Sequence, residues 1–167
     1  RNIPIISTFH SWNINRPEWM NFADAFGFNM CDMIFTVSTY WKEHLQNQYD
    51  ISSDKIKIIP WGLDLGYFES IQPAGDEKKY CGNGMNFMAL GRIDERKGLH
   101  FLLAAFLQFV KSVRDAKLII VGEVADEQYY ATLTKFVDEH RLHDQVVFTG
   151  KLESPYSLMK ACDVFVF

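Results

Sequence analysis

Residues 85–110, MNFMALGRIDERKGLHFLLAAFLQFV, decide the fold class of this 167-residue chain. The run opens with a short apolar segment, Met85 to Leu90, which is typical of a buried β-strand. A polar stretch bounded by glycines follows, and the spacing then predicts a helix from Gly98 to Val113. Further strands are expected at 117–121, 146–149 and 164–167, and further helices at about 126–141 and 155–161. Strands and helices that alternate at this spacing indicate βαβ units and a parallel sheet, hence an α/β fold.

The helix expected at 98–113 is rich in apolar residues on most of its surface. One face would carry Leu99, Leu102, Leu103, Phe106 and Val110, with Phe101, Ala105 and Phe109 beside it. Because so little of the circumference is polar, we expect this helix to be buried on more than one side.

The first part of the chain shows a second set of alternating elements. Strands are expected at 3–8, 32–38 and 56–60, one helix opens at Pro17, and another spans 40–48. Ser38 or Thr39 can cap this second helix by accepting a backbone N–H. Apolar periodicity disappears between residues 70 and 84, where Pro73 and three glycines lie among charged residues. We therefore expect one domain over 1–70, a linker over 71–84 and a second domain over 85–167.

The composition excludes several functional classes of protein. Seventeen Lys and Arg against 21 Asp and Glu give a formal net charge of −4, without a basic patch, so we expect no nucleic-acid partner. No stretch reads as a signal peptide or is long enough to span a bilayer. Cys31, Cys81 and Cys162 lack metal-ligand spacing, so we expect reduced thiols in a cytoplasmic protein and no metal site. The chain begins in one strand-like run and ends in another, so we expect the natural protein to extend at both ends.

A candidate site lies between the strand that ends near Leu90 and the helix that begins near Gly98. In open α/β sheets, ligands bind just outside the carboxyl ends of the strands. Gly91 lets the backbone approach a phosphate, Arg92 can donate two hydrogen bonds to phosphate oxygens, and Lys97 can add a point charge. The helix N-terminus at Gly98 favours an anion as well. The alternative is an ordinary solvated turn. The glycine-rich dinucleotide fingerprint and the P-loop are both absent.

Five motifs follow one another in a recognisable order. They are Cys31-Asp32 to Ser38; Ile58 to Asp64 with Phe68; Gly91-Arg92 with Lys97-Gly98; Leu118 to Gly122; and Val146 to Gly150 with Ala161 to Val164. In this order they resemble glycosyltransferase family 4, the retaining GT-B enzymes also called group-1 glycosyltransferases. The resemblance implies two Rossmann-like domains with parallel sheets, both incomplete in this chain.

The resemblance also implies a function and a set of site residues. The expected reaction moves a sugar, as a hexosyltransferase does, from a nucleotide-diphosphate-sugar donor to an unnamed acceptor with retention of configuration and without a metal or other cofactor. Arg92 and Lys97 would bind the donor diphosphate and act in catalysis, with Gly91, Gly98 and Gly122 close to the nucleotide. His10 matches a family histidine near the donor sugar, although a histidine at a strand end can also simply bond to backbone.

Two rival functions stay open at this point. One is a sugar-nucleotide epimerase of the same architecture, and the other is a non-catalytic module that only binds nucleotide. The family resemblance also allows association with a membrane surface through the N-terminal domain. Because the family's glutamate pair and its N-terminal glycine-rich loop are not in this sequence, we expect the chain alone to be inactive.

Overall fold

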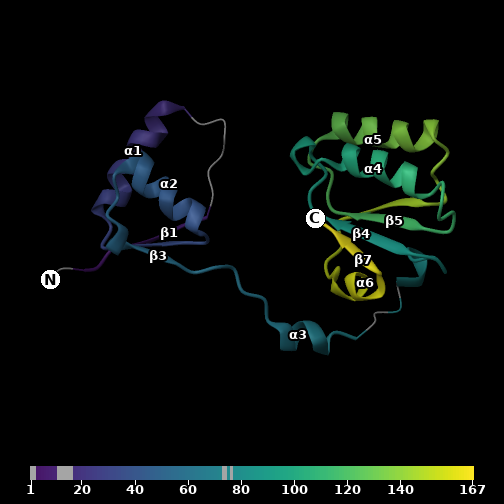
Figure 1. Cartoon of the computed structure of the whole chain (residues 1–167), viewed down its shortest axis with the longest axis horizontal. Helices are drawn as coiled ribbons and strands as arrows, with labels where there is room; N and C mark the ends of the chain where they lie inside the picture. Colours follow the sequence, from purple (N-terminus) through teal and green to yellow (C-terminus); the bar gives the residue numbers. More distant parts are fainter. Residues whose placement is uncertain (1–2, 11–16, 73–74, 76) are drawn as a thin grey trace. The chain divides into compact units, whose positions relative to one another are not determined.

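The computed structural model describes residues 3–10, 17–72, 75 and 77–167. Pro73, which we named in the expected linker, lies outside this set. The chain divides into two compact units, Arg1–Asp64 and Leu65–Phe167, each with its own parallel sheet (Figure 1). The division falls earlier than the residue 70 at which we placed the end of the first domain. None of the helices among the described residues is both long enough and apolar enough to cross a membrane.

Unit 1 is a three-stranded parallel sheet in the order β1-β2-β3. Its elements are β1 (Ile6–Phe9), α1 (Glu18–Met30), β2 (Met33–Thr36), α2 (Thr39–Tyr49), the 3-10 turn η1 (Ser53–Lys55) and β3 (Ile56–Ile58). Side chains of α1 and α2 pack with Ile34 and Ile56, which are buried, so both helices contribute to one core. The Ser38 hydroxyl accepts the N–H of Trp41 at 3.4 Å, which confirms the predicted cap of α2.

Unit 2 is a four-stranded parallel sheet in the order β6-β5-β4-β7. Its elements are α3 (Leu65–Ser70), η2 (Glu77–Lys79), β4 (Asn86–Leu90), η3 (Glu95–Lys97), α4 (Leu99–Phe109), β5 (Lys117–Val121), α5 (Glu127–Glu139), β6 (Val146–Gly150), α6 (Tyr156–Ala161) and β7 (Val164–Val166). The alternation predicted from the sequence is confirmed, with small shifts at element ends.

The two faces of this sheet form two separate cores. Helices α4 and α5 cover one face and α6 covers the other (Figure 1). Ala89, Leu118 and Ile120 point to the first core, and Met88 and Ile119 point to the second. The inner parts of β4 and β5, Phe87–Leu90 and Leu118–Val121, are apolar throughout because alternate side chains are covered on both faces, as in doubly covered parallel sheets.

The prediction that the helix at 98–113 is buried on several sides is wrong. Leu99, Leu103 and Phe106 of α4 are buried, but Phe101 is 73% exposed. Helix α4 lies in an outer layer, so within this unit only the side that meets the sheet and α5 is covered. An apolar composition alone could not tell this one-sided packing from burial in a third layer.

Helix α3 was not predicted, because six residues are too few for a recognisable apolar period. The Lys160 ammonium of α6 donates to the carbonyl oxygens of Glu69 at 3.0 Å and Ile71 at 2.9 Å. The ring of Phe68 lies 5.9 Å from the same ammonium. A cation at the carboxyl end of a helix satisfies carbonyl groups that lack partners within the helix. These contacts place α3 in unit 2.

Candidate functional site

The segments that follow β4 and β5 are joined by backbone hydrogen bonds. Gly91 N–H donates to Val121 O at 2.9 Å, and Ile93 N–H donates to Glu123 O at 2.9 Å. Gly122 makes this approach possible, because a Cβ there would lie 1.8 Å from the carbonyl oxygen of Gly91. We predicted Gly122 beside the nucleotide. The structure gives it a position against Gly91, where it lets two strand ends meet.

The loop from Gly91 to Gly98 folds Lys97 back over the end of β4. A Cβ at Gly91 would lie 3.4 Å from Lys97 Cε and 3.8 Å from its Nζ. Gly98 has a φ of 63°, a left-handed conformation that ends η3 and starts α4. The two glycines therefore leave room for the lysine side chain and set the turn that carries it.

A cavity of about 500 Å³ opens at this carboxyl edge of the sheet. Three cationic side chains line it, namely Arg92, Arg96 and Lys97, and apolar groups such as Leu90 and Phe101 line the rest. The structure thus brings together four of the predicted site residues, Gly91, Arg92, Lys97 and Gly98. A cavity lined by both cations and apolar side chains suits an anionic ligand that also has a flat apolar part.

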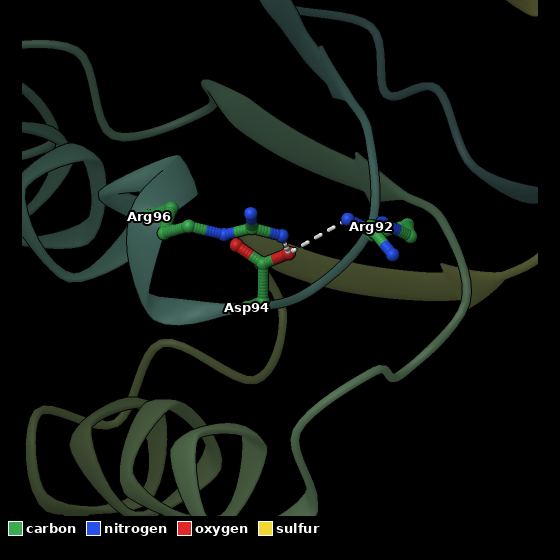
Figure 2. Close-up of polar contacts among 3 residues, drawn as sticks. All are labelled: Arg92, Asp94 and Arg96. Atoms are coloured by element: carbon green, nitrogen blue, oxygen red, sulfur yellow. Dashed lines mark hydrogen bonds and ion pairs between the residues drawn. The ribbon is translucent and has the colours of Figure 1, made fainter. Parts of the chain in front are cut away.

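The carboxylate of Asp94 lies between the two arginines of this loop (Figure 2). Its Oδ2 accepts a hydrogen bond from Arg96 at 3.0 Å and pairs with Arg92 at 3.6 Å. The hydrogen bond from Arg96, followed by the charges of Arg96 and Arg92, lowers the pKa of Asp94 from its ordinary value. Asp94 is therefore an anion at neutral pH.

The amino end of α4 is only partly available to an anion. The N–H of His100 donates to the Tyr129 hydroxyl at 3.0 Å, and the imidazole Nδ1 lies 2.8 Å from the same oxygen. Burial raises the pKa of Tyr129, so the phenol stays neutral. One of the backbone N–H groups at the start of α4 is therefore already bonded and cannot donate to an anion. Attraction of an anion to this site depends more on the cations of the loop.

His10 lies in unit 1, directly after β1. Its ring stacks on Trp61 with the centroids 4.9 Å apart and the planes at 26°. Both rings line a cavity of about 240 Å³ together with Thr36, whose side chain is buried at the end of β2. The stacking gives His10 a fixed partner within unit 1. Its contact with a donor sugar stays a prediction.

Sequence reasoning missed Asp94 and Arg96. Their signal was present in the alternation of charges along Arg92, Asp94 and Arg96, but an exposed loop commonly shows the same pattern. Only the burial of Asp94, at 8% exposure, separates it from an ordinary surface carboxylate. No cluster of His, Cys, Asp and Glu that could hold a metal ion occurs within the described ranges.

Known proteins resemble this chain in sequence and in fold. A family model described as glycosyl transferases group 1 matches residues 83–167, and a model described as Glycosyltransferase Family 4 matches residues 1–67. An uncharacterized glycosyltransferase of Methanocaldococcus jannaschii is 24% identical over 148 residues, which are 87% of this chain and 36% of that protein. The chain thus spans about a third of that relative's length.

Two solved structures extend the comparison to the fold. A glycosyltransferase from Rickettsia africae superimposes with a TM-score of 0.78 and 22% identity, over 96% of this chain and 44% of that one. Anabaena HepE, solved in complex with UDP and glucose, gives a TM-score of 0.73 and 20% identity over 97% of this chain and 45% of its own. These likenesses confirm the expected fold class, the Rossmann-like parallel sheets of GT-B enzymes. The first family model spans just over half of the sequence, and the chain belongs to the glycosyl transferases of group 1.

Proposed function

We propose that the intact protein transfers a sugar from a nucleoside-diphosphate sugar to an acceptor, with retention of configuration at the anomeric carbon. The observation that carries this proposal is the loop of Arg92, Arg96 and Lys97 at the carboxyl edge of the unit 2 sheet. Its glycines bring the backbone close, and its cations line part of a cavity large enough for a nucleotide.

Charge stabilisation is the chemistry that this loop can supply. When the bond between the anomeric carbon and the diphosphate breaks, negative charge grows on the leaving oxygen and positive charge grows on the sugar. Arg92 can bind two phosphate oxygens through its planar guanidinium, and Lys97 can reach a third as a point charge. Cations fixed before the reaction stabilise the departing diphosphate without reorganising during it. No metal is proposed, because these side chains supply the positive charge.

His10 is proposed to contact the donor sugar, following the family resemblance. Its stacking on Trp61 would hold the imidazole in one orientation, which a positioned hydrogen bond to a sugar hydroxyl requires. The acceptor has no candidate among the described features. For the donor, the UDP bound to Anabaena HepE makes UDP the first nucleotide to try.

The test is a titration of the ¹⁵N-labelled protein with UDP, GDP and ADP, followed by NMR. We expect shifts at the amides of Gly91 to Leu99 and a dissociation constant weaker by about tenfold or more in Arg92→Ala and in Lys97→Ala, since each removes a charge-assisted hydrogen bond. Lys135→Ala is the matched control, because Lys135 is an exposed cation on α5 paired with Glu139. Equal affinities in all four proteins, or no shifts with any nucleotide, would leave the loop as a solvated turn.

A further inference from the structure

We propose that Asp94 is a positioning residue, which holds the guanidinium groups of Arg92 and Arg96 in place for the donor diphosphate. The inference rests on the proposed function and deepens it. It also assigns Arg96 a role beside Arg92 and Lys97, as a third cation of the phosphate-binding loop.

The geometry gives Asp94 two cationic partners. Figure 2 shows its carboxylate between the guanidinium of Arg96 and that of Arg92, with both contacts made by Oδ2. The Asp94 side chain is 12% exposed, whereas those of Arg92 and Arg96 are 55% and 69% exposed. A mostly buried carboxylate thus contacts two long, exposed side chains, and both of these line the cavity. Fixing them in advance lowers the side-chain entropy that binding would otherwise cost.

Fold stability alone does not explain a carboxylate at this position. Its Oδ1 is buried and finds no hydrogen-bond partner among the described residues. An unsatisfied buried oxygen is unfavourable, and the exposed arginines offset this only in part because water screens their charges. A buried carboxylate with one oxygen unused is better accounted for by the direction it imposes on Arg92 and Arg96.

The charge of Asp94 makes the inference easy to contradict. Residues 92–97 carry three cations and two anions, Asp94 and Glu95. If Asp94 acted only through its charge, it would repel a diphosphate, and its neutralisation would tighten binding. If it positions the arginines, its neutralisation weakens binding. The two readings therefore predict opposite signs for the same substitution.

The experiment compares Asp94→Asn with Glu95→Gln by calorimetric titration with UDP and with inorganic pyrophosphate. Both variants remove one negative charge from the loop, but Glu95 is exposed and makes neither arginine contact. We expect Asp94→Asn to bind both probes about tenfold more weakly than the wild type, and Glu95→Gln to bind them equally or more tightly. Binding by Asp94→Asn as tight as that by Glu95→Gln would overturn the inference.

Two further measurements keep a folding defect apart from a positioning defect. Thermal unfolding reports whether Asp94→Asn keeps its structure, and the arginine Nε–Hε signals report on the side chains directly. We expect the signals of Arg92 and Arg96 to sharpen and move toward free arginine in Asp94→Asn, and to recover partly in Asp94→Glu. Unchanged signals in a folded Asp94→Asn protein would overturn the proposal. A wild type that binds neither probe would refute the proposed function itself.

Discussion

In unit 1, the Asp32 carboxylate accepts the N–H of Ile5 at 2.7 Å, and the N–H of Asp32 donates back to Ile5 O at 2.8 Å. In unit 2, Asp163 repeats this arrangement with Asn86, at 2.7 Å and 2.9 Å. Both aspartates directly precede a strand, β2 in the first case and β7 in the second, and both follow a cysteine. The two sheets therefore start a pair of parallel strands with the same hydrogen-bonded pair.

The carboxyl ends of the same sheets differ. The edge of unit 1 presents an aromatic pair, His10 and Trp61, whereas the edge of unit 2 presents three cations around a cavity. At the amino ends, the side chains have only to align the backbones of two strands, and the same aspartate–backbone pair does this in both sheets. The carboxyl ends are where ligands of α/β sheets bind, so their side chains follow the ligand instead. Asp32 and Asp163 therefore serve to build the sheets, whereas the side chains at the carboxyl ends are the candidates for ligand binding.

The largest expected effect tests the backbone joint of unit 2, where Gly122 lies against Gly91. Gly122→Ala places a Cβ 1.8 Å from Gly91 O at a φ of 155°, so the ends of β4 and β5 must move apart. We expect a loss of about 3 kcal/mol in the free energy of unfolding of unit 2, which falls among the costs of overpacking and backbone strain. Denaturant unfolding followed by hydrogen exchange measures each unit separately.

Gly62→Ala is the matched control in unit 1, because nothing lies within 4 Å of a Cβ built there. Its effect should stay within about 0.5 kcal/mol, as for ordinary surface substitutions. UDP binding should fail in Gly122→Ala, since the loop that carries Arg92 begins at this joint. Unchanged stability of Gly122→Ala would mean that the ends of β4 and β5 separate at little cost. The close contact between these strand ends would then not distinguish the carboxyl edge of unit 2 from that of unit 1.

Much of the fold could be predicted because apolar runs and their spacing determine it. The strands of both units and all helices but α3 follow from alternation, and the Ser38 cap follows from its side chain. The exposure of Phe101 could not be predicted, because an apolar helix surface does not state what covers it. Helix α3 was missed because its six residues show no recognisable apolar period, and its contacts with Lys160 join residues far apart in the sequence.

The candidate site was predicted in part, for a similar reason. Gly91, Arg92, Lys97 and Gly98 belong to one short run between a strand and a helix, so a local pattern could indicate them. Asp94 belongs to the same run, but its importance rests on burial, which is a tertiary property. The close approach of Gly122 to Gly91 joins residues about thirty positions apart, and no local pattern reports such a contact.

A smaller effect tests whether Asp32 and Asp163 stabilise the starts of their strands in the same way. Asp163→Ala and Asp32→Ala each remove the acceptor of one backbone N–H, and we expect losses of about 1–2 kcal/mol and about 0.5–1 kcal/mol in the free energy of unfolding. The first should be larger, because Asn86 is 6% exposed whereas Ile5 is 48% exposed. Denaturant unfolding of the four single variants, including Asp163→Asn and Asp32→Asn, measures this.

The asparagine variants are the controls, since an amide oxygen can still accept the N–H. They should keep most of the stability that the alanine variants lose. Equal losses for Asn and Ala at either site would show that the charge matters and the hydrogen bond does not. Acceptance of the backbone N–H would then not be the stabilising role that Asp32 and Asp163 share.

The smallest effect concerns the boundary between the two regions. Lys160→Met removes the ammonium that holds the carbonyl oxygens of Glu69 and Ile71 while it keeps a side chain of similar length. We expect a local loss of about 1 kcal/mol, seen as roughly fivefold faster hydrogen exchange at Ile71, whose N–H donates to Phe68 O, with global unfolding unchanged. Lys135→Met, which breaks only an exposed pair with Glu139, should leave that exchange unaltered. If Ile71 exchanges at the same rate in both variants, α3 does not depend on α6. The boundary between the units would then lie beyond α3, closer to residue 70, where the change in composition placed it.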